Sequence, residues 1–223
     1  MENASKALLM AGGMLIALLI IGALLLVFNQ IGDYEKAQTT SEKTSQVADF
    51  NKEYAKYSGD NIKGYDVITI INKAIDFNSK EGTTKETANS VDYSKKITIT
   101  ITNMKAFTNK YGVDDATEWL KGKVDTYSIK SSTDVIPQGI KTFSSLEQKY
   151  KLSKLSNLSA NYDSIKNGDK TVKDILGTDD SSITLNVIAQ YREYSEFKNS
   201  TFKNTDIQYN GDQIVGMTFQ FVK

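Results

Sequence analysis

The side chains that could carry out chemistry in this sequence are mainly carboxylates and lysines, because it contains no His and no Cys. Without these two residue types, a Ser-His-Asp or Cys-His arrangement cannot form, and the preferred ligands of zinc are missing. Chemistry based on carboxylates alone remains open, such as a pair of acids in a glycosidase or a set of oxygen ligands for Ca²⁺.

The acidic doublets Asp114-Asp115 and Asp179-Asp180 are the candidates for such chemistry. Neither belongs to a D-x-D-x-D-G loop, and the sequence has no G-x-x-x-x-G-K-[ST] or G-x-G-x-x-G motif for phosphates. We therefore interpret each doublet as the opening of a helix or a turn. The sequence predicts no catalytic residues, no metal site and no cofactor, so we expect that the protein is not an enzyme. A carboxylate-dependent hydrolase is the less favoured alternative.

The charge balance argues against nucleic acid as a partner. The 27 Lys and Arg residues equal the 27 Asp and Glu residues, and Arg192 is the only arginine. Phosphate clamping and base readout rely on a positive surface and on the bidentate arginine side chain. We therefore expect no nucleic-acid binding, and the absence of Cys excludes disulfides from the stabilisation of the fold.

The segment that must position everything else is the apolar run ALLMAGGMLIALLIIGALLLVF at residues 7–28, which has no charge and no Pro. As a helix, 22 residues extend about 33 Å, enough to cross a hydrocarbon core of about 30 Å. The run is longer than the core of a secretory signal, and no Ala-x-Ala pattern follows it. We interpret it as an uncleaved membrane span, with a cleaved signal and a buried soluble helix as the alternatives.

The size of the segments on either side of the run predicts its orientation. The Lys counts next to the run are nearly balanced, so they decide little. A tail at residues 1–6, one span at 7–28 and a long remainder is the layout of a signal anchor that exports the rest of the chain. We expect a single-pass protein of the cell membrane with a cytoplasmic N-terminus and an extracellular C-terminal domain.

Two helices are predicted directly after the span. At 29–58, the aromatic and apolar residues Val47, Phe50, Tyr54 and Tyr57 recur at helical spacing and predict a stalk helix that docks on the domain. Its polar part at 36–46 could instead be a flexible linker, and Gly59 is expected to end the helix in a left-handed conformation. An apolar stripe then predicts a helix over 65–78.

Alternating patterns predict four strands, at 96–103, 183–191, 204–209 and 213–222, which suggest one antiparallel sheet with helices over its apolar face. A short helix is expected over 195–202. We therefore predict an α+β protein in which residues 59–223 form the extracytoplasmic domain.

The last two strands would form a hairpin around Asn210-Gly211. A three-residue loop ending at Asp212 pairs Ile207 with Val215 and collects the apolar side chains on one face, so we expect this longer loop with a glycine-assisted bulge.

The stretch at 104–182 is predicted to be irregular and helical. Helical spacing of apolar residues covers 142–158, a short helix should end at Gly177, and Pro137 should mark a loop. The sequence around Trp119 begins with capping-type aspartates. The twelve Tyr residues are expected to lie mainly in the core rather than to form a binding surface.

An apolar N-terminal helix with a very short leader, continued by an amphipathic helix that packs on an antiparallel sheet, resembles the layout of type IV pilins and pseudopilins. The segment MENASKALLMAGGMLIALLIIGALLLVFNQ also resembles small single-span envelope proteins of low-GC Firmicutes. The resemblance covers residues 1–78 best. Pilin precursors carry a Gly before the processing site and a Glu inside the helix, whereas Glu2 precedes the apolar run here, so the resemblance does not extend to prepilin-type processing.

Small residues within the span suggest a partner. Ala7 and Ala11, and likewise Gly13 and Ala17, are four residues apart, the spacing that lets two membrane helices approach closely. Small residues are common in any span, so a face that contacts only lipid is the alternative. We expect the span to self-associate or to bind a protein partner.

Together these patterns predict a membrane-anchored structural or interaction protein, with a pilin-like subunit of an envelope secretion or adhesion apparatus as its specific form. A membrane-tethered module that binds or senses a ligand is the alternative.

Overall fold

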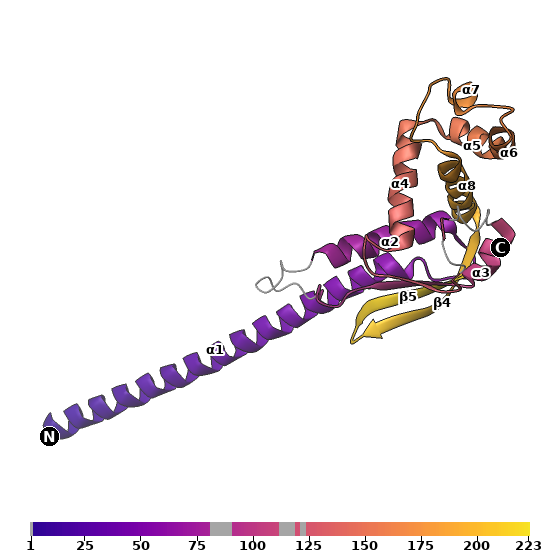
Figure 1. The fold of residues 1–223 in the computed structure, drawn as a ribbon. Helices are drawn as coiled ribbons and strands as arrows, with labels where there is room; N and C mark the ends of the chain where they lie inside the picture. The colour runs from indigo at the N-terminus through magenta and orange to yellow at the C-terminus, as the bar shows by residue number, and fades with distance from the viewer. Residues whose placement is uncertain (1, 81–90, 112–118, 121–123) are drawn as a thin grey trace.

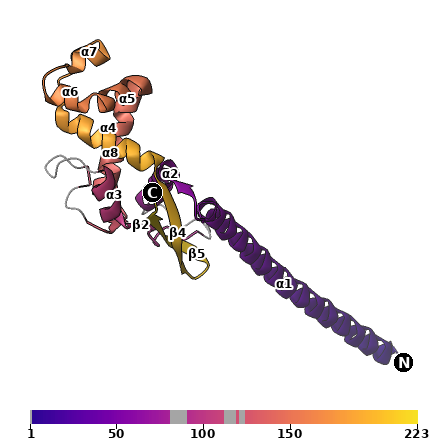
Figure 2. The ribbon, with the colours of Figure 1, turned by 90° about the vertical axis from the view of Figure 1, so that its right-hand side faces the viewer.

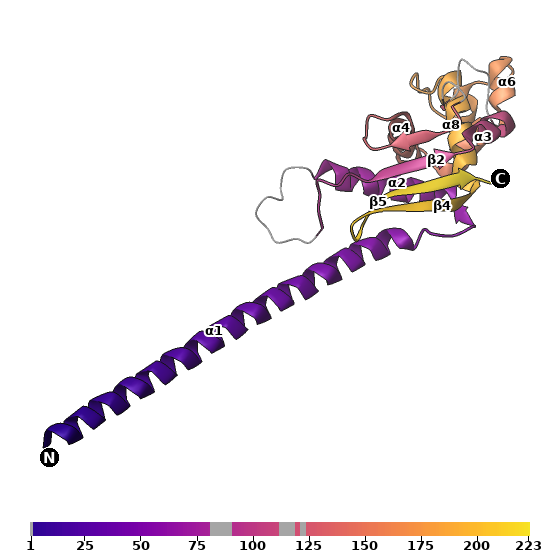
Figure 3. The same ribbon diagram turned by 90° about the horizontal axis from the view of Figure 1, so that it is seen from below.

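The computed structural model describes residues 2–80, 91–111, 119–120 and 124–223, and these form an α+β protein (Figure 1). A long helix, α1, leads from the N-terminus to a domain in which helices pack on a five-stranded sheet. Helices α2 and α8 lie on one face of the sheet, and the strands lie in front of them when the protein is seen from below (Figure 3). The predicted fold class is therefore confirmed in outline, although the sheet differs from the predicted one.

Helix α1 is continuous from Glu2 to Ala55, which makes it about 80 Å long at 1.5 Å per residue. It therefore includes both the apolar run and the predicted stalk, and its polar part at 36–46 is helical rather than a linker. Figure 2 shows that most of α1 extends away from the domain. The helix ends four residues before Gly59, which does not have a positive φ, so the predicted left-handed cap is wrong.

The sheet is mixed, with the strand order β1-β4-β5-β2-β3. The strands are β1 (Ile62–Lys63), β2 (Thr98–Thr102), β3 (Tyr127–Ile129), β4 (Thr201–Asn210) and β5 (Gln213–Phe221). β2 and β5 pair in parallel, whereas the other pairs are antiparallel. The prediction of one antiparallel sheet of four strands is thus wrong, because parallel pairing joins segments far apart in the sequence and leaves no local turn signal.

The predicted strand at 183–191 is also wrong, since α8 covers Leu185–Asn199. Thr184 caps this helix by accepting a hydrogen bond from the backbone N–H of Val187 at 3.3 Å. The buried side chains follow helical spacing over the whole element: Ile188, Ala189, Tyr191, Tyr194 and Phe197. The predicted helix at 195–202 corresponds to the end of α8, and β4 begins at Thr201.

The β4–β5 hairpin has a different register from the predicted one. Asn210 pairs with Gln213, so only two residues form the loop, and Ile207 pairs with Met217 rather than with Val215. The predicted glycine-assisted bulge at the loop is wrong as well, because the irregularities lie within the strands, one of them with Val215 as an extra residue in β5. This extra residue brings Ile214, on one side of it, and Met217, on the other, to the buried face.

The predicted helix at 65–78 is confirmed as α2 (Gly64–Ser79), and its apolar stripe is buried. Between β2 and α8 lie α3 (Met104–Tyr111), α4 (Val135–Lys149), α5 (Leu152–Ala160), α6 (Tyr162–Lys166) and α7 (Val172–Leu176). The last three lie at the end of the domain farthest from the N-terminus (Figures 1 and 2).

Several local predictions for this region can be compared with the helices. Gly177 ends α7 with φ 77°, as expected. Pro137 lies in the first turn of α4 rather than in a loop, where its missing N–H costs no helical hydrogen bond. The doublet Asp114-Asp115 lies outside the described residues.

The core lies between the sheet and the helices, and aromatic rings fill much of it. Phe107, Phe197, Phe202 and Phe221 form a chain of ring contacts with centroids 5.0–5.9 Å apart. The buried tyrosines are Tyr54, Tyr162, Tyr191 and Tyr194, and the most exposed are Tyr34, Tyr65 and Tyr209.

The close approach of α2 to α8 predicts a strong effect of substitution at Gly64. A Cβ at this position would lie 1.7 Å from the carbonyl oxygen of Phe197, so Gly64→Ala should lower the free energy of unfolding by about 3 kcal/mol. Gly59→Ala is the control, because nothing lies within 4 Å of its Cβ position, and it should change stability by less than about 0.5 kcal/mol. Denaturant unfolding in detergent measures both, and equal effects would contradict the packing argument.

Candidate functional site

The first candidate site is the apolar part of α1, whose described side chains are exposed. The stretch Gly12–Gln38 contains 18 consecutive residues with a mean hydropathy of 2.5, and none of these is buried. Large side chains along it are about half exposed or more, including Leu24 at 50% and Phe28 at 67%. Exposure of so much apolar surface to water is unfavourable by about 25 cal/mol per Å². The helix therefore has the properties of a membrane span or a signal sequence.

The four small residues predicted to mediate helix packing do not form one stripe. All four lie on the backbone of α1, but at 3.6 residues per turn the pair Ala7/Ala11 is about 120° away from the pair Gly13/Ala17 around the helix axis. The two pairs therefore lie on different sides of α1 and could not both take part in the same helix–helix contact. Gly13 and Ala17 are exposed, as are the large side chains around them.

The second candidate site is the junction where the end of α1 meets the domain. The Phe50 ring lies 5.0 Å from the rings of both Tyr54 and Phe77, and Phe77 stacks on Tyr93 at 4.8 Å. Tyr54 is 4% exposed, and its burial raises the pKa of its hydroxyl. The predicted docking face is therefore confirmed.

A polar clamp fixes the same junction. The side-chain amide of Asn51 donates to the carbonyl oxygen of Asp212 at 2.6 Å and accepts from the backbone N–H of Ile214 at 2.9 Å. Glu53 accepts a hydrogen bond from Lys73 of α2 at 2.5 Å, and this contact lowers the pKa of the Glu53 carboxyl. Both contacts hold α1 in one rotational position on the domain.

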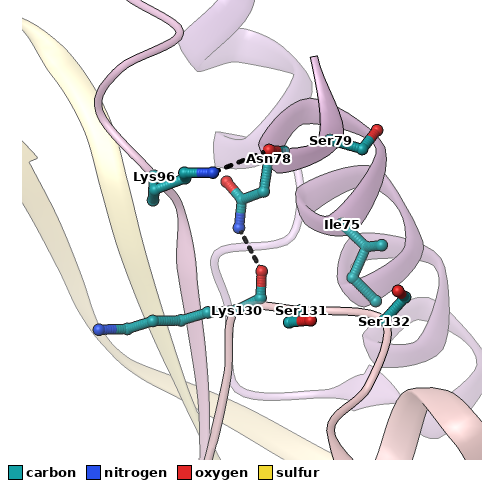
Figure 4. Close-up of a pocket in the computed structure, with 7 residues that line it drawn as sticks. All are labelled: Ile75, Asn78, Ser79, Lys96, Lys130, Ser131 and Ser132. Atoms are coloured by element: carbon teal, nitrogen blue, oxygen red, sulfur yellow. Dashed lines mark hydrogen bonds between the residues drawn. The ribbon is translucent and has the colours of Figure 1, made fainter. Parts of the chain in front are cut away.

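The third candidate site is a pocket of about 210 Å³ between the end of α2, the segment before β2 and the turn after β3 (Figure 4). Its wall is formed by Asn78, whose amide N–H₂ donates to the carbonyl oxygens of Ile97 and Lys130, each at 2.8 Å. The same side chain accepts from the backbone N–H of Ile97 at 2.8 Å. Asn78 thus satisfies three backbone groups and joins α2 to the residue before β2 and the residue after β3.

The other polar groups of this pocket are arranged for structure rather than for binding. Lys96 donates to the carbonyl oxygen of Asn78 at 3.0 Å, and the Ser79 hydroxyl donates to that of Asp76 at 2.7 Å. The Lys130 side chain extends away from Lys96 (Figure 4). The pocket is also smaller than the roughly 300–1,000 Å³ usual for small-molecule sites. No group in it is positioned as a nucleophile with a base.

The carboxylates with the closest contacts also hold elements together. Asp180 accepts from Lys149 at 2.7 Å, from the Tyr150 hydroxyl and from Ser182, and the Lys149 contact above all keeps the pKa of its carboxyl far below the ordinary value. The backbone N–H of Ser182 also donates to it at 3.0 Å. The doublet Asp179-Asp180 therefore forms a turn, as predicted.

Two further carboxylates also join separate parts of the fold. Glu147 accepts from Lys198 at 2.9 Å and from the Tyr191 hydroxyl at 3.0 Å, which links α4 to α8. Glu193 is fully buried and accepts from the backbone N–H of Trp119 at 2.6 Å. Among the residues that the structure describes, no cluster of three acidic side chains could hold a metal ion.

Comparison with known proteins does not add an assignment to this geometry. No family model, curated protein or solved structure matches the chain significantly. The two asparagines that join distant segments at the candidate sites, Asn51 and Asn78, were not singled out by sequence reasoning. An Asn within an apolar helical stripe is the only local signal that could have indicated them.

The polar clamp at the junction predicts that Asn51→Ala loosens the end of α1. The substitution removes both hydrogen bonds and leaves the Ile214 N–H without this acceptor, so the free energy of unfolding of the domain should fall by about 1–2 kcal/mol. Lys52→Ala, exposed on the same turn, is the matched control. Protease cleavage of α1 near the junction should become faster only in Asn51→Ala, and unchanged cleavage would show that the aromatic contacts suffice.

The three hydrogen bonds of the Asn78 side chain predict that its substitution lowers stability more than substitution of Asn51. Asn78→Ala would leave two carbonyl groups and one N–H buried without this partner, so we expect a loss of about 2–4 kcal/mol. Asn72→Ala, an exposed position of the same helix, should have an effect below about 0.5 kcal/mol. Thermal unfolding of the two variants provides the measurement, and a small effect of Asn78→Ala would mean that water replaces the amide.

Proposed function

We propose that this protein is a membrane-anchored, extracytoplasmic structural or interaction protein, and that it serves as a subunit of an envelope assembly. The observation that carries the proposal is the continuity of α1, since one unbroken helix contains both the exposed apolar stretch and the residues that dock on the domain. In this arrangement the bilayer covers the apolar part, and the domain stands at a fixed distance from it.

The rigidity of the connection favours a structural role over a tethered enzyme or sensor. A flexible linker is enough to hold an enzyme near a membrane. Here the helix is fixed by Phe50, Tyr54 and Asn51, so the orientation of the domain relative to the anchor is also fixed. A defined orientation is useful where many subunits must present the same surface to a partner.

The absence of a convergent site points in the same direction. In the described part of the chain, Lys96 beside the pocket and Asp180 elsewhere in the domain are both engaged in structural hydrogen bonds. A ligand-binding module would be supported by an apolar pocket with a few polar groups directed into it. The pocket beside Asn78 lacks this arrangement. A secretion or adhesion apparatus is the form of assembly that the pilin-like layout of the chain suggests.

The proposed topology places the N-terminus in the cytoplasm and the domain outside the cell. The experiment that tests it combines fractionation after an alkaline wash, protease treatment of intact cells, and the mass of the mature protein. We expect the protein to remain in the membrane fraction with residues 7–28 retained, and the domain to be degraded only by external protease.

A pair of matched variants shows whether the apolar stretch causes the retention. Leu18→Arg combined with Ile21→Arg should release much of the protein, because each Arg at the centre of a span costs about 3 kcal/mol. Leu18→Ile combined with Ile21→Leu should behave as the wild type. A soluble mature protein that begins beyond Phe28 would overturn the anchor, and protection of the domain in intact cells would overturn the orientation.

A further inference from the structure

Helix α1 carries an apolar seam that continues beyond the hydrophobic run. Leu24, Val27, Ile31 and Tyr34 alternate in steps of three and four residues, and they are 50%, 50%, 49% and 72% exposed. Gln38 occupies the next position of the same pattern, and Gly13, Ala17 and Ile20 occupy the earlier ones. Steps of three and four residues place side chains along the line where two helices contact in a coiled coil. We call these eight residues the seam.

The seam lies on the side of α1 opposite the domain. At 3.6 residues per turn, the direction of Ile31, Tyr34 and Gln38 is about 180° from that of the docking residues Phe50, Asn51 and Tyr54. The domain therefore does not block access to the seam. Figure 3 shows the domain on one side of the end of α1, with the rest of the helix free of it.

The charges around the seam suit a parallel copy of the same helix. Of the charged side chains that the structure describes at 29–46, Asp33 and Lys36 are directed away from the seam, and Glu35 and Glu42 flank one side of it. In a parallel pair this acidic flank meets the other flank of the partner helix, which has the uncharged Gln30 and Ala37. In an antiparallel pair the two acidic flanks would meet and repel. Two copies anchored in the same membrane are parallel and present identical residues at the same height.

The polar part of α1 also needs a source of stability. Five of the residues at 37–46 are Thr or Ser, each of which is up to about 0.7 kcal/mol less favourable in a helix than Ala. The side chains that the structure describes at 37–46 are exposed, and the contacts of α1 with the sheet lie near the end of the helix. Packing of a second helix would stabilise it, as it does most helices of proteins.

We propose that two copies of this chain associate in parallel through the seam of α1, with Ile31, Tyr34 and Gln38 in contact just outside the membrane and Gly13 and Ala17 in contact within it. The proposal rests on the proposed function, because it needs the membrane anchor to align the copies. Gln38 would then lie beside Gln38 of the second copy, where a polar pair at one position fixes the register.

Disulfide crosslinking tests the proposal directly, since the chain has no Cys of its own. Single variants of the full chain in membranes would carry Ile31→Cys, Tyr34→Cys or Gln38→Cys, and the matched controls Asp33→Cys and Lys36→Cys lie on the other side of the helix. We expect mild oxidation to give at least about fivefold more dimer from each seam variant than from either control.

Other outcomes would overturn the proposal. Equal crosslinking at all five positions would indicate random collision, no crosslinking would indicate separate helices, and an adduct that is not twice the mass of the chain would indicate a different partner. A chain that leaves the membrane fraction would instead contradict the proposed function, so the two failures can be told apart.

A second set of variants examines the part of the seam inside the membrane. On the Ile31→Cys background, Gly13→Leu combined with Ala17→Leu should reduce the dimer by at least about fivefold, because the two helices could no longer approach closely. Gly22→Leu, on the opposite side of the helix, should have no effect. If both variants crosslink like the parent, the contact within the membrane does not exist.

Discussion

The structure depends on one constraint: a single helix must stay continuous from an apolar stretch that avoids water to a face that packs on the domain. The apolar stretch is stable as a helix in lipid because every backbone group there is satisfied within the helix. At the other end, Phe50 and Tyr54 are held by the aromatic cluster around Phe77. Between these regions, the described side chains of the polar turns are exposed, so the two fixed ends help to keep these turns helical.

The ionic side chains of this protein are used mainly to join helices and turns. A chain without His and Cys has few groups that change protonation near neutral pH. The Asp180 carboxyl, whose pKa is far below the ordinary value, stays ionised down to strongly acidic conditions and keeps its contact with Lys149. Protonation of Asp180 at low pH would remove that contact. The contact therefore stabilises the fold fully at pH values above the pKa that this carboxyl has in the unfolded chain. Its contribution is lost as the pH falls through the lower pKa that the carboxyl has in the folded protein. This behaviour is typical of a structural ion pair.

Much of the fold could be predicted where a pattern was long and local. The apolar run is helical throughout within α1, and the stripe of α2 and the alternation of Ile and Thr in β2 are buried on the predicted faces. The alternation at 183–191 led to the wrong prediction of a strand, because the same apolar residues also fit a helix. The helix is favoured by the cap at Thr184 and by the later buried residues Tyr194 and Phe197, which continue the helical spacing. The parallel pairing of β2 with β5 gave no local signal.

The contacts of the candidate sites could not be predicted for a related reason. Asn51 reaches groups 161 and 163 residues away in the sequence, so no spacing rule connects it with the hairpin.

The position of the domain on α1 connects the fold to the proposed function. Had the domain docked on the seam side, the same helix could still anchor it, but Ile31 and Tyr34 would be covered by the domain. The actual docking face leaves these side chains exposed along the helix that we propose as the membrane anchor. Exposed apolar side chains on a polar stalk are costly for a protein that works alone, whereas they are the expected contact of a subunit that works beside identical copies. For this reason we propose that the anchor of this protein is also its interface for assembly.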